Sequence, residues 1–362
     1  MCPETNSPPG RPAIRRDPVV AVVGATGAVG REFLACLETR RFPLRGLRLF
    51  ASARSAGVRL MFKGEALPVE ELTDESLDGI DIALFSAGST AAKVFAPGAA
   101  RRGTVVIDNS SAFRMAADVP LVVPEINAAA IAGHRGIIAN PNCVAIISNM
   151  ALWPIHRRNR IRRIFAATYQ SASGAGAAAM AELTEATRAY LDGRPHRPSV
   201  LRHPYAFNLF SHDSAVDPAS GYNGEEIKVM QETRKIFADP EIRIGITCVR
   251  VPVLRAHSMA LTVECERPID PEAARAMLRE APGVRLVDDV ANNRFPMPRD
   301  AADQGEVLVG RIRRDLGDPD GRSLSLFAAG DQLLKGAALN AVQIAEHLPA
   351  AGFALPQAAL PG

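Results

Sequence analysis

The sequence has few of the features that mark membrane or secreted proteins. Its 362 residues include a single Trp, and no apolar run reaches the roughly 18 residues that a membrane-spanning helix needs. The five cysteines are odd in number and never spaced C-x-x-C, which argues against a disulfide framework and against a zinc site. The polar, Pro-rich N-terminus lacks the apolar core of a secretory signal, so residues 1–17 are predicted to form a disordered leader. We expect a cytoplasmic protein with free thiols, no metal site and no membrane contact.

Charge of either sign is also in little excess, because 42 Lys and Arg residues face 39 Asp and Glu residues. The exception is "HRRNRIRRI" at residues 156–164, with five arginines, but no aromatic residues and no binding motif accompany it. We interpret this stretch as the solvated end of a helix and the start of a strand, so no nucleic-acid partner is predicted. The chain is longer than the roughly 250–300 residues of a single hydrophobic core, which predicts two domains.

Strands alternate with helices in the first part of the chain. A β-branched run at residues 19–23 precedes a glycine turn and a segment with helical spacing of apolar residues, and three further strand-like runs follow before residue 112. This alternation predicts βαβ units and a parallel sheet. From about residue 160 the strand-like runs are longer, and they surround a helical stretch at 177–190. This second part is predicted to be α+β with a mostly antiparallel sheet.

The glycine loop "GATGAVG" directly follows the first predicted strand and opens a helix. Gly24, Gly27 and Gly30 permit a tight turn and a close approach of the backbone to a pyrophosphate at a helix N-terminus. The spacing G-x-x-G-x-x-G is a weaker match than G-x-G-x-x-G, so a plain glycine-rich turn is the alternative. No acidic residue ends the second strand to bind a ribose hydroxyl. Arg54 and Ser55 stand there instead, which favours NADP over NAD unless Arg54 is simply a surface arginine.

Cys143 follows an Asn-Pro-Asn segment at the predicted start of a helix. Free cysteines are most often packed in a core, whereas a helix N-terminus stabilises a thiolate. Position alone therefore leaves both a buried thiol and a reactive nucleophile open. A base and a substrate anchor stand on one predicted strand, "VRVPVLRAHS", where Arg250 and His257 lie seven residues apart. A guanidinium binds a carboxylate and an imidazole can accept the thiol proton.

Three further polar side chains extend the candidate set. Gln170 ends the run "IFAATYQ" and precedes the small-residue segment "SASGAGAAAM", where a ligand can approach the backbone closely. Arg114, after "DNSSAF", and Lys228, in "GEEIKVMQETRKI", provide a second anion site. Each of them taken alone can equally be read as a surface residue, so the argument rests on the whole set.

Eleven segments, in this order, resemble the aspartate-β-semialdehyde dehydrogenase family from about Val19 to Leu348. They are "GATGAVG", "SARSAG", "DNSSAFRM", "VPEIN", "NPNC", "YQSASGAG", "EEIKVMQETRKI", "TCVRVPV..AHS", "FPMPRDA", "VGRIRRD" and "AAGDQLLKGAALNAVQIAE". The resemblance implies an α/β fold with a Rossmann-like NADP-binding domain at residues 18–142, completed by a C-terminal helix at 331–350. Residues 143–330 would form an α+β catalytic and dimerisation domain with a mostly antiparallel mixed sheet, in a homodimer or homotetramer.

The resemblance also implies a role for each candidate residue. Cys143 would be the nucleophile that forms a thioacyl-enzyme, and His257 would be the acid/base. Gln170 would be the substrate-orienting amide, and Asn142 would provide the amide that holds the oxyanion. Arg250 would bind the substrate carboxylate and Glu225 its ammonium group. Arg114 and Lys228 would bind the phosphate. The cofactor NADP would be bound by Gly24, Thr26, Gly27, Ala28, Val29, Arg54, Ser55, Ser173, Gly174 and Gln332.

The implied reaction is the NADPH-dependent reductive dephosphorylation of L-4-aspartyl phosphate to L-aspartate 4-semialdehyde. It belongs to the biosynthesis of lysine, threonine, methionine and diaminopimelate, and its small-molecule partners are the two substrates and phosphate.

Two departures from the family pattern leave the substrate open. Val144 and Ala145 follow the nucleophile where the family usually has Ser or Thr, and Ala256 precedes the histidine where Gly is frequent. One alternative is a paralogue that reduces a related acyl phosphate such as N-acetyl-γ-glutamyl phosphate, although its acylated amine would give Glu225 no purpose. The other alternative is a non-catalytic NADP-binding homologue, and the joint presence of the candidate catalytic residues argues against it.

Overall fold

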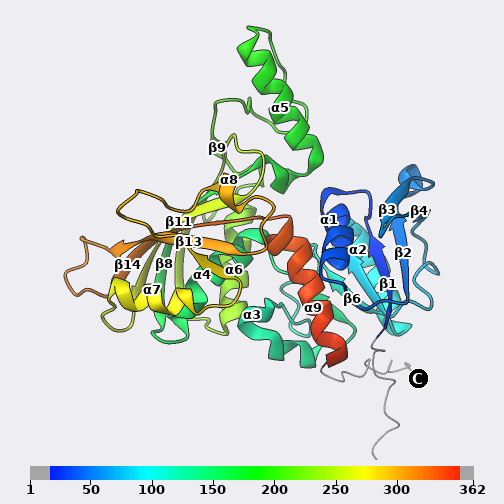
Figure 1. The fold of residues 1–362 in the computed structure, drawn as a ribbon, viewed down its shortest axis with the longest axis horizontal. Coiled ribbons are helices and arrows are strands. Elements are labelled where there is room, and N and C mark those ends of the chain that lie inside the picture. The colour runs from blue at the N-terminus through cyan, green and yellow to red at the C-terminus, as the bar shows by residue number, and fades with distance from the viewer. Residues whose placement is uncertain (1–16, 351–362) are drawn as a thin grey trace, which may run out of the picture.

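The first part of the chain forms an open, mostly parallel sheet. The computed structural model describes residues 17–350, so the predicted leader, apart from Asp17, lies outside the described residues. Within that range, seven strands lie in the order β3-β4-β2-β1-β5-β6-β7, and the β3/β4 hairpin is the antiparallel pair (Figure 1). The strands are β1 (Val19–Val23), β2 (Gly46–Ala51), β3 (Arg59–Phe62), β4 (Glu65–Glu71), β5 (Ile82–Phe85), β6 (Val105–Asp108) and β7 (Ile137–Ala139).

Helices cover this first sheet because its central strands are apolar on both faces. Strands β5 and β6 are buried along their whole length, as parallel strands with helices on either side must be. The helical segments are α1 (Ala28–Thr39), α2 (Gly88–Arg101), α3 (Pro124–Asn127) and the 3₁₀ turns η1 (Ala53–Ser55) and η2 (Ala128–Gly133). The predicted βαβ organisation of this part is confirmed.

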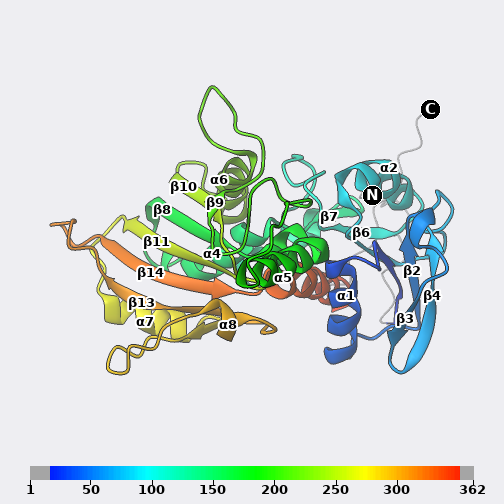
Figure 2. The same cartoon turned by 90° about the horizontal axis from the view of Figure 1, so that it is seen from above.

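The second part of the chain is built on a mixed sheet in the strand order β12-β13-β14-β11-β8-β10-β9. The β8/β10 and β12/β13 pairs are parallel and the other pairs are antiparallel, as predicted. The strands are β8 (Ile161–Gln170), β9 (Phe210–Ser211), β10 (Arg243–Arg250), β11 (His257–Cys265), β12 (Val284–Leu286), β13 (Val307–Arg314) and β14 (Ser323–Gly330). Figure 2 shows the two sheets at opposite ends of the molecule.

The helices of the second part shield one face of this sheet and project one arm from it. They are α4 (Cys143–His156), the 3₁₀ turn η3 (Ala172–Ala175), α5 (Ala177–Leu191), α6 (Gly224–Phe237), α7 (Pro271–Arg279) and α8 (Pro298–Ala301). Helix α4 is buried almost all round, because it shares one hydrophobic core with α6, α7 and the sheet. Helix α5 confirms the helical stretch predicted near 177–190, and it projects away from the sheet (Figure 1).

The end of the described chain returns to the first sheet. A π-helical turn, η4 (Leu334–Ala338), leads directly into α9 (Leu339–Ala350). Ala341, Val342 and Ile344 lie in the same hydrophobic cluster as Val20 and Phe33 of the first sheet and α1. Domain boundaries at residues 142 and 330 stay a prediction. Within residues 17–350, none of the helices has both the length and the apolar character needed to cross a membrane.

One predicted strand was wrong. Arg250 ends β10 and His257 begins β11, and β8 lies between these two strands in the sheet. The chain cannot run straight through, because Pro252 lacks the N–H that a sheet ladder needs and Ala256 has φ of 71°, in the left-handed region. The turn nevertheless returns His257 to the same end of β8 at which Arg250 stands.

Candidate active site

A cavity of about 420 Å³ lies where the carboxyl ends of strands from both sheets meet. Fourteen of the predicted site residues line it. They come from the glycine loop and the start of α1, the loop after β6, the start of α4, the end of β8, η3, α6, β10, β11 and the segment after β14. The four predicted residues outside the lining are Gly24, Thr26, Arg54 and Ser55. A larger and more open hollow of about 870 Å³ lies on the second sheet and contains none of the predicted residues.

Cys143 is the first residue of α4, half-buried at the cavity wall. The Asn142 side chain caps the helix by accepting hydrogen bonds from the N–H groups of Val144 and Ala145. Burial, with the negative charge of Glu225, raises the pKa of the Cys143 thiol to about 12, against the helix N-terminus and the neighbouring arginines. A helix N-terminus by itself favours the thiolate, but burial and Glu225 outweigh it here and favour the protonated thiol.

Val144 and Ala145 are fully buried and do not line the cavity. Val144 packs in the hydrophobic core with Ile146 and Ile147. The missing hydroxyl groups that separate this sequence from its family pattern therefore do not change the surface that a substrate meets.

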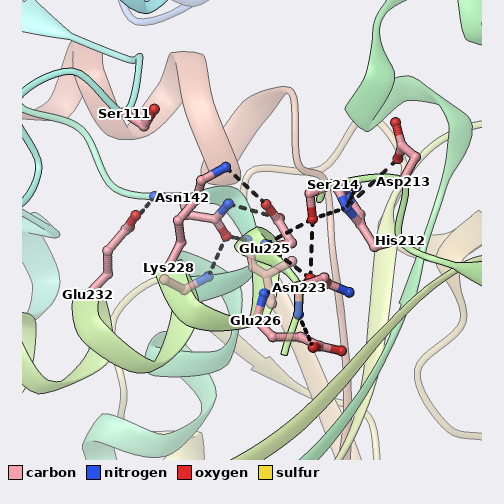
Figure 3. Close-up of polar contacts among 12 residues, drawn as sticks. Ser111, Asn142, His212, Asp213, Ser214, Asn223, Glu225, Glu226, Lys228 and Glu232 are labelled. Atoms are coloured by element: carbon pink, nitrogen blue, oxygen red, sulfur yellow. Dashed lines mark hydrogen bonds and ion pairs between the residues drawn. The ribbon is translucent and has the colours of Figure 1, made fainter. Parts of the chain in front are cut away.

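A buried acidic residue that the sequence analysis missed, Glu232 of α6, holds the turn before Cys143 and the Arg114 side chain together. One of its oxygens accepts a hydrogen bond from the Asn142 N–H at 2.6 Å (Figure 3). The other oxygen pairs with Arg114 at 3.1 Å. The Arg114 guanidinium also donates to the carbonyl oxygens of Asn140 and Asn109. Since arginine has five N–H donors, two remain for an anion in the cavity.

Glu225, in the first turn of α6, is the acidic centre of the cavity. Its Oε1 accepts hydrogen bonds from the side-chain amides of Asn142 at 2.9 Å and Gln170 at 3.2 Å, and Lys228 lies 3.7 Å from its Oε2. Burial opposes its ionisation, but His212, Lys228 and the two amide donors together hold its pKa below the ordinary value. The carboxylate is therefore ionised at neutral pH and able to accept an ammonium group.

Arg250 and Gln170 are neighbours because β10 and β8 are paired in parallel and in register at these two residues. The Arg250 side chain is only 5% exposed, and its Nε donates to Asp213 at 3.2 Å while Nη1 donates to the Ser171 carbonyl at 3.3 Å. A buried guanidinium with N–H groups to spare is suited to a carboxylate ligand.

His257 is fully buried, and its two ring nitrogens have different surroundings. Nδ1 accepts a hydrogen bond from the Ser171 N–H at 3.0 Å, which assigns the ring proton of the neutral imidazole to Nε2. Burial and Arg250 hold the pKa of His257 well below its ordinary value, so the ring is neutral. Nε2 has no hydrogen-bond partner within residues 17–350, and His257 lines the cavity, so Nε2–H is a donor available to a ligand.

The glycine loop has the features of a pyrophosphate site. Gly24 has φ of 86°, and a Cβ there would lie 2.3 Å from the Ser86 carbonyl oxygen, so only glycine fits. A Cβ on Gly30 would lie 2.2 Å from the Gly24 carbonyl oxygen, so the absence of a side chain at Gly30 lets α1 pack closely on the loop. The first turn of α1 carries neither a capping side chain nor an acidic residue, so its N–H groups are open to an anion.

The second candidate cofactor segment lies beside His257 and Arg250. Gln332 donates to the Ser173 hydroxyl and accepts from the Ala256 N–H at 3.0 Å, which ties η3 to the segment after β14. A Cβ on Gly174 would lie 2.9 Å from His257 Cε1 and 3.0 Å from Arg250 Nη1. Glycine at this position is therefore required for the chain to pass so close to both side chains.

Several cavity residues escaped the sequence analysis. They are Ser86, Asn109, Ser111, Pro141, Gly176, His212, Leu333, Gly336 and Ala337. A signal existed for those that follow strands of the parallel sheet, because loops at the carboxyl ends of such strands form the ligand site. Only the structure shows why glycine stands at position 336, since a Cβ there would lie 2.9 Å from the Cβ of Cys143.

Among residues 17–350, no three His, Cys, Asp or Glu side chains gather into a metal-binding group.

Both parts of the chain match families of known proteins. Residues 19–134 match the family described as "Semialdehyde dehydrogenase, NAD binding domain", and residues 152–335 match "Semialdehyde dehydrogenase, dimerisation domain". The chain is 53% identical over 334 residues to an aspartate-semialdehyde dehydrogenase of Synechocystis sp., covering 92% of this chain and 98% of the relative. It is 45% identical over 338 residues to that of Bacillus subtilis, covering 91% of this chain and 96% of the relative.

Solved structures agree with these matches. The crystal structure of aspartate semialdehyde dehydrogenase II of Vibrio cholerae complexed with ASA has a TM-score of 0.89 and 43% identity, covering 92% of this chain and 98% of that one. An aspartate semialdehyde dehydrogenase of Candida albicans with NADP has a TM-score of 0.71 at 22% identity, which shows a shared fold.

Proposed function

Because the chain belongs to the aspartate-semialdehyde dehydrogenase family, we propose that it converts L-4-aspartyl phosphate into L-aspartate 4-semialdehyde with NADPH. The observation that carries the proposal is the charge pattern around the Cys143 thiol. The cavity holds one ionised carboxylate, Glu225, and three cations, Arg114, Lys228 and Arg250. An aspartyl phosphate carries the matching ammonium, phosphate and α-carboxylate groups.

The first half of the proposed reaction forms a thioester on Cys143. Its sulfur attacks the acyl carbon, the bond to phosphate breaks, and the thiol proton leaves with the phosphate as hydrogen phosphate. Arg114 and Lys228 bind the phosphate, while Arg250 binds the α-carboxylate and Glu225 the ammonium group. The pairing of Glu225 with the substrate ammonium offsets the negative charge that raises the pKa of the Cys143 thiol, which lowers the cost of releasing its proton to the phosphate.

His257 acts in the proposed mechanism through Nε2–H, which donates a hydrogen bond to the substrate carbonyl oxygen. The second hydrogen of the Asn142 amide and the Cys143 N–H at the start of α4 add to the stabilisation of the oxyanion, worth about 3 kcal/mol per donor in enzymes of this kind. Gln170, hydrogen-bonded to Glu225, orients the substrate from the other side. When bound, the reduced nicotinamide supplies the hydride that turns the thioester into the aldehyde.

The preference for NADP rests on the end of β2. The glycine loop and Ser173, Gly174 and Gln332 would hold the dinucleotide, and Arg54 in η1 would bind its 2′-phosphate. Arg54 is exposed and makes no ion pair within residues 17–350, so its charge is available. Arg54→Ser should raise KM for NADP about tenfold and leave KM for NAD unchanged. Arg59→Ser on the neighbouring hairpin is the control, and equal effects on the two cofactors would contradict the assignment.

We retain the division of the chain into a cofactor domain at 18–142 with the C-terminal helix and a catalytic domain at 143–330. The match to a dimerisation domain supports a homodimer or a homotetramer of such chains. Sedimentation equilibrium distinguishes the two assemblies, and a monomer at micromolar concentration would contradict both.

The test of the proposed function is a substrate panel in the reverse direction. With phosphate and NADP, the enzyme should reduce NADP with L-aspartate 4-semialdehyde and not with N-acetylglutamate semialdehyde. Cys143→Ala should abolish turnover while NADP binding, followed by fluorescence quenching, is retained. Turnover of the acetylated substrate would favour the paralogue, and no turnover by the wild type would refute an enzymatic role in this pathway.

A further inference from the structure

The segment Phe210–Asn223 brings two unpredicted side chains, those of His212 and Asp213, to the candidate active site. His212 follows the short edge strand β9 and is tied to β10 by a hydrogen bond from its N–H to the Cys248 carbonyl oxygen at 2.9 Å. The His212 ring lines the cavity. Figure 3 shows His212, Asp213 and Ser214 forming one turn beside Glu225.

Asp213 holds the guanidinium of Arg250 from one side. Its Oδ1 accepts from Nε at 3.2 Å, and the Ser171 carbonyl oxygen accepts from Nη1 at 3.3 Å. One contact uses the Nε hydrogen and the other uses one Nη1 hydrogen. Both Nη2 hydrogens and the second Nη1 hydrogen are therefore left for a ligand. Burial raises the cost of an ionised Asp213, but Arg250 and His212 hold its pKa below the ordinary value, so the pair is charged at neutral pH.

Ser214 connects the same turn to the acidic centre of the cavity. Its Oγ accepts a hydrogen bond from the Glu225 N–H at 3.0 Å and donates to the Asn223 side chain at 3.2 Å. The Ser214 N–H donates to Nδ1 of the His212 ring at 3.2 Å, which closes the turn on itself. One three-residue turn therefore contacts the anchors proposed for the carboxylate and for the ammonium group.

We propose that Asp213 is a positioning residue for the amino-acid end of the substrate: it orients Arg250 so that the guanidinium presents its remaining N–H groups to the α-carboxylate. The proposal rests on the proposed function and adds to it a residue that no substrate atom touches. Asp213 has no part in the phosphate site, because the Arg114 guanidinium is held by Glu232 and two carbonyl oxygens. The role is specific for substrates that carry a carboxylate.

Asp213→Ala tests the proposal through kinetics in the reverse direction, with NADP, phosphate and either of two aldehydes. KM for L-aspartate 4-semialdehyde should rise about tenfold or more, because a charged hydrogen bond that fixes Arg250 is lost. KM for phosphate should stay within about twofold of the wild type, and so should kcat/KM for 3-aminopropanal, the same aldehyde without its carboxylate. Asp213→Asn, which retains an acceptor oxygen but no charge, should lie between the wild type and Asp213→Ala.

Asp217→Asn is the matched control, because this carboxylate lies four residues further on and, among residues 17–350, bonds only with Ser220 and Ala219. A fall in the aspartate semialdehyde KM of Asp213→Ala would overturn the proposal, since Asp213 would then be competing with the substrate carboxylate. Equal losses with both aldehydes and phosphate would also overturn it and indicate a role in folding alone. No turnover by the wild type would refute the proposed function together with the inference, whereas wild-type turnover with unchanged Asp213→Ala kinetics would refute the inference only.

Discussion

The protonation state of Cys143 gives the sharpest prediction of the site chemistry. With a pKa of about 12, the thiolate makes up roughly one part in ten thousand of the free enzyme at pH 8. Forming the thiolate at this pH therefore costs about 5 kcal/mol, which substrate binding must offset. Alkylation by iodoacetamide follows the thiolate population, so its rate on the free enzyme should rise about tenfold per pH unit from pH 7 to pH 10 without levelling off.

Glu225→Gln provides the matching perturbation. The negative charge of Glu225 is the largest contribution after burial to the raised pKa of Cys143, so removing it should lower that pKa and accelerate alkylation at pH 8 about tenfold. The same variant should bind aspartate semialdehyde more weakly, because the ammonium partner is lost. Mass spectrometry of the modified peptide distinguishes Cys143 from Cys2 and from the buried Cys36, Cys248 and Cys265. A rate that reaches a plateau below pH 9, or no acceleration in Glu225→Gln, would refute the reasoning.

Three further predictions concern the frame of the site. Lys335 is fully buried and pairs with Glu125 at 2.6 Å, so Lys335→Met should reduce the free energy of unfolding by about 3–5 kcal/mol in urea titrations, and adding Glu125→Gln should restore part of the loss. Burial opposes ionisation of Glu182, but hydrogen bonds from three consecutive backbone N–H groups of the loop after α5 and from a serine hydroxyl lower its pKa to about 2. The stabilisation of that loop by Glu182 should be complete above pH 4.5 and lost as the pH falls toward 2. Glu182→Gln should therefore speed tryptic cleavage of the loop at pH 7, and cleavage at the wild-type rate would contradict this. Gly336→Ala should reduce kcat about tenfold or more with cofactor binding retained, since its Cβ would displace Cys143, and an unchanged kcat would show that the site adapts.

The parts of the site that stand at strand ends could be predicted from the sequence. Gln170 and Arg250 end strands that pair in parallel, and Cys143 opens the helix after β7, so a pattern of strands followed by polar residues was enough to bring them together. The roles assigned to these residues stay a prediction, whereas the α/β fold and the mixed second sheet are confirmed.

The parts that escaped prediction depend on contacts between distant segments. Glu232 pairs with Arg114 across 118 positions, and Asp213 with Arg250 across 37, yet nothing in the local pattern distinguishes either acid from a surface residue. The protonation state of the Cys143 thiol could not be predicted for a related reason. A helix N-terminus can be read from the sequence, whereas the burial and the nearby Glu225 charge that outweigh it belong to the tertiary structure.

The position of α9 has a consequence for the order in which the molecule is made. The cluster that covers the first sheet includes Ala341, Val342 and Leu348, which leave the ribosome some 200 residues after β7 (Ile137–Ala139). During synthesis the first sheet therefore keeps an uncovered apolar surface until the whole second part has been made. A nascent chain released before α9 should therefore aggregate or bind chaperones, even though every strand of its first sheet is complete. The first sheet is therefore completed by α9 only in a chain that also contains Cys143 and the other cavity residues of the second part.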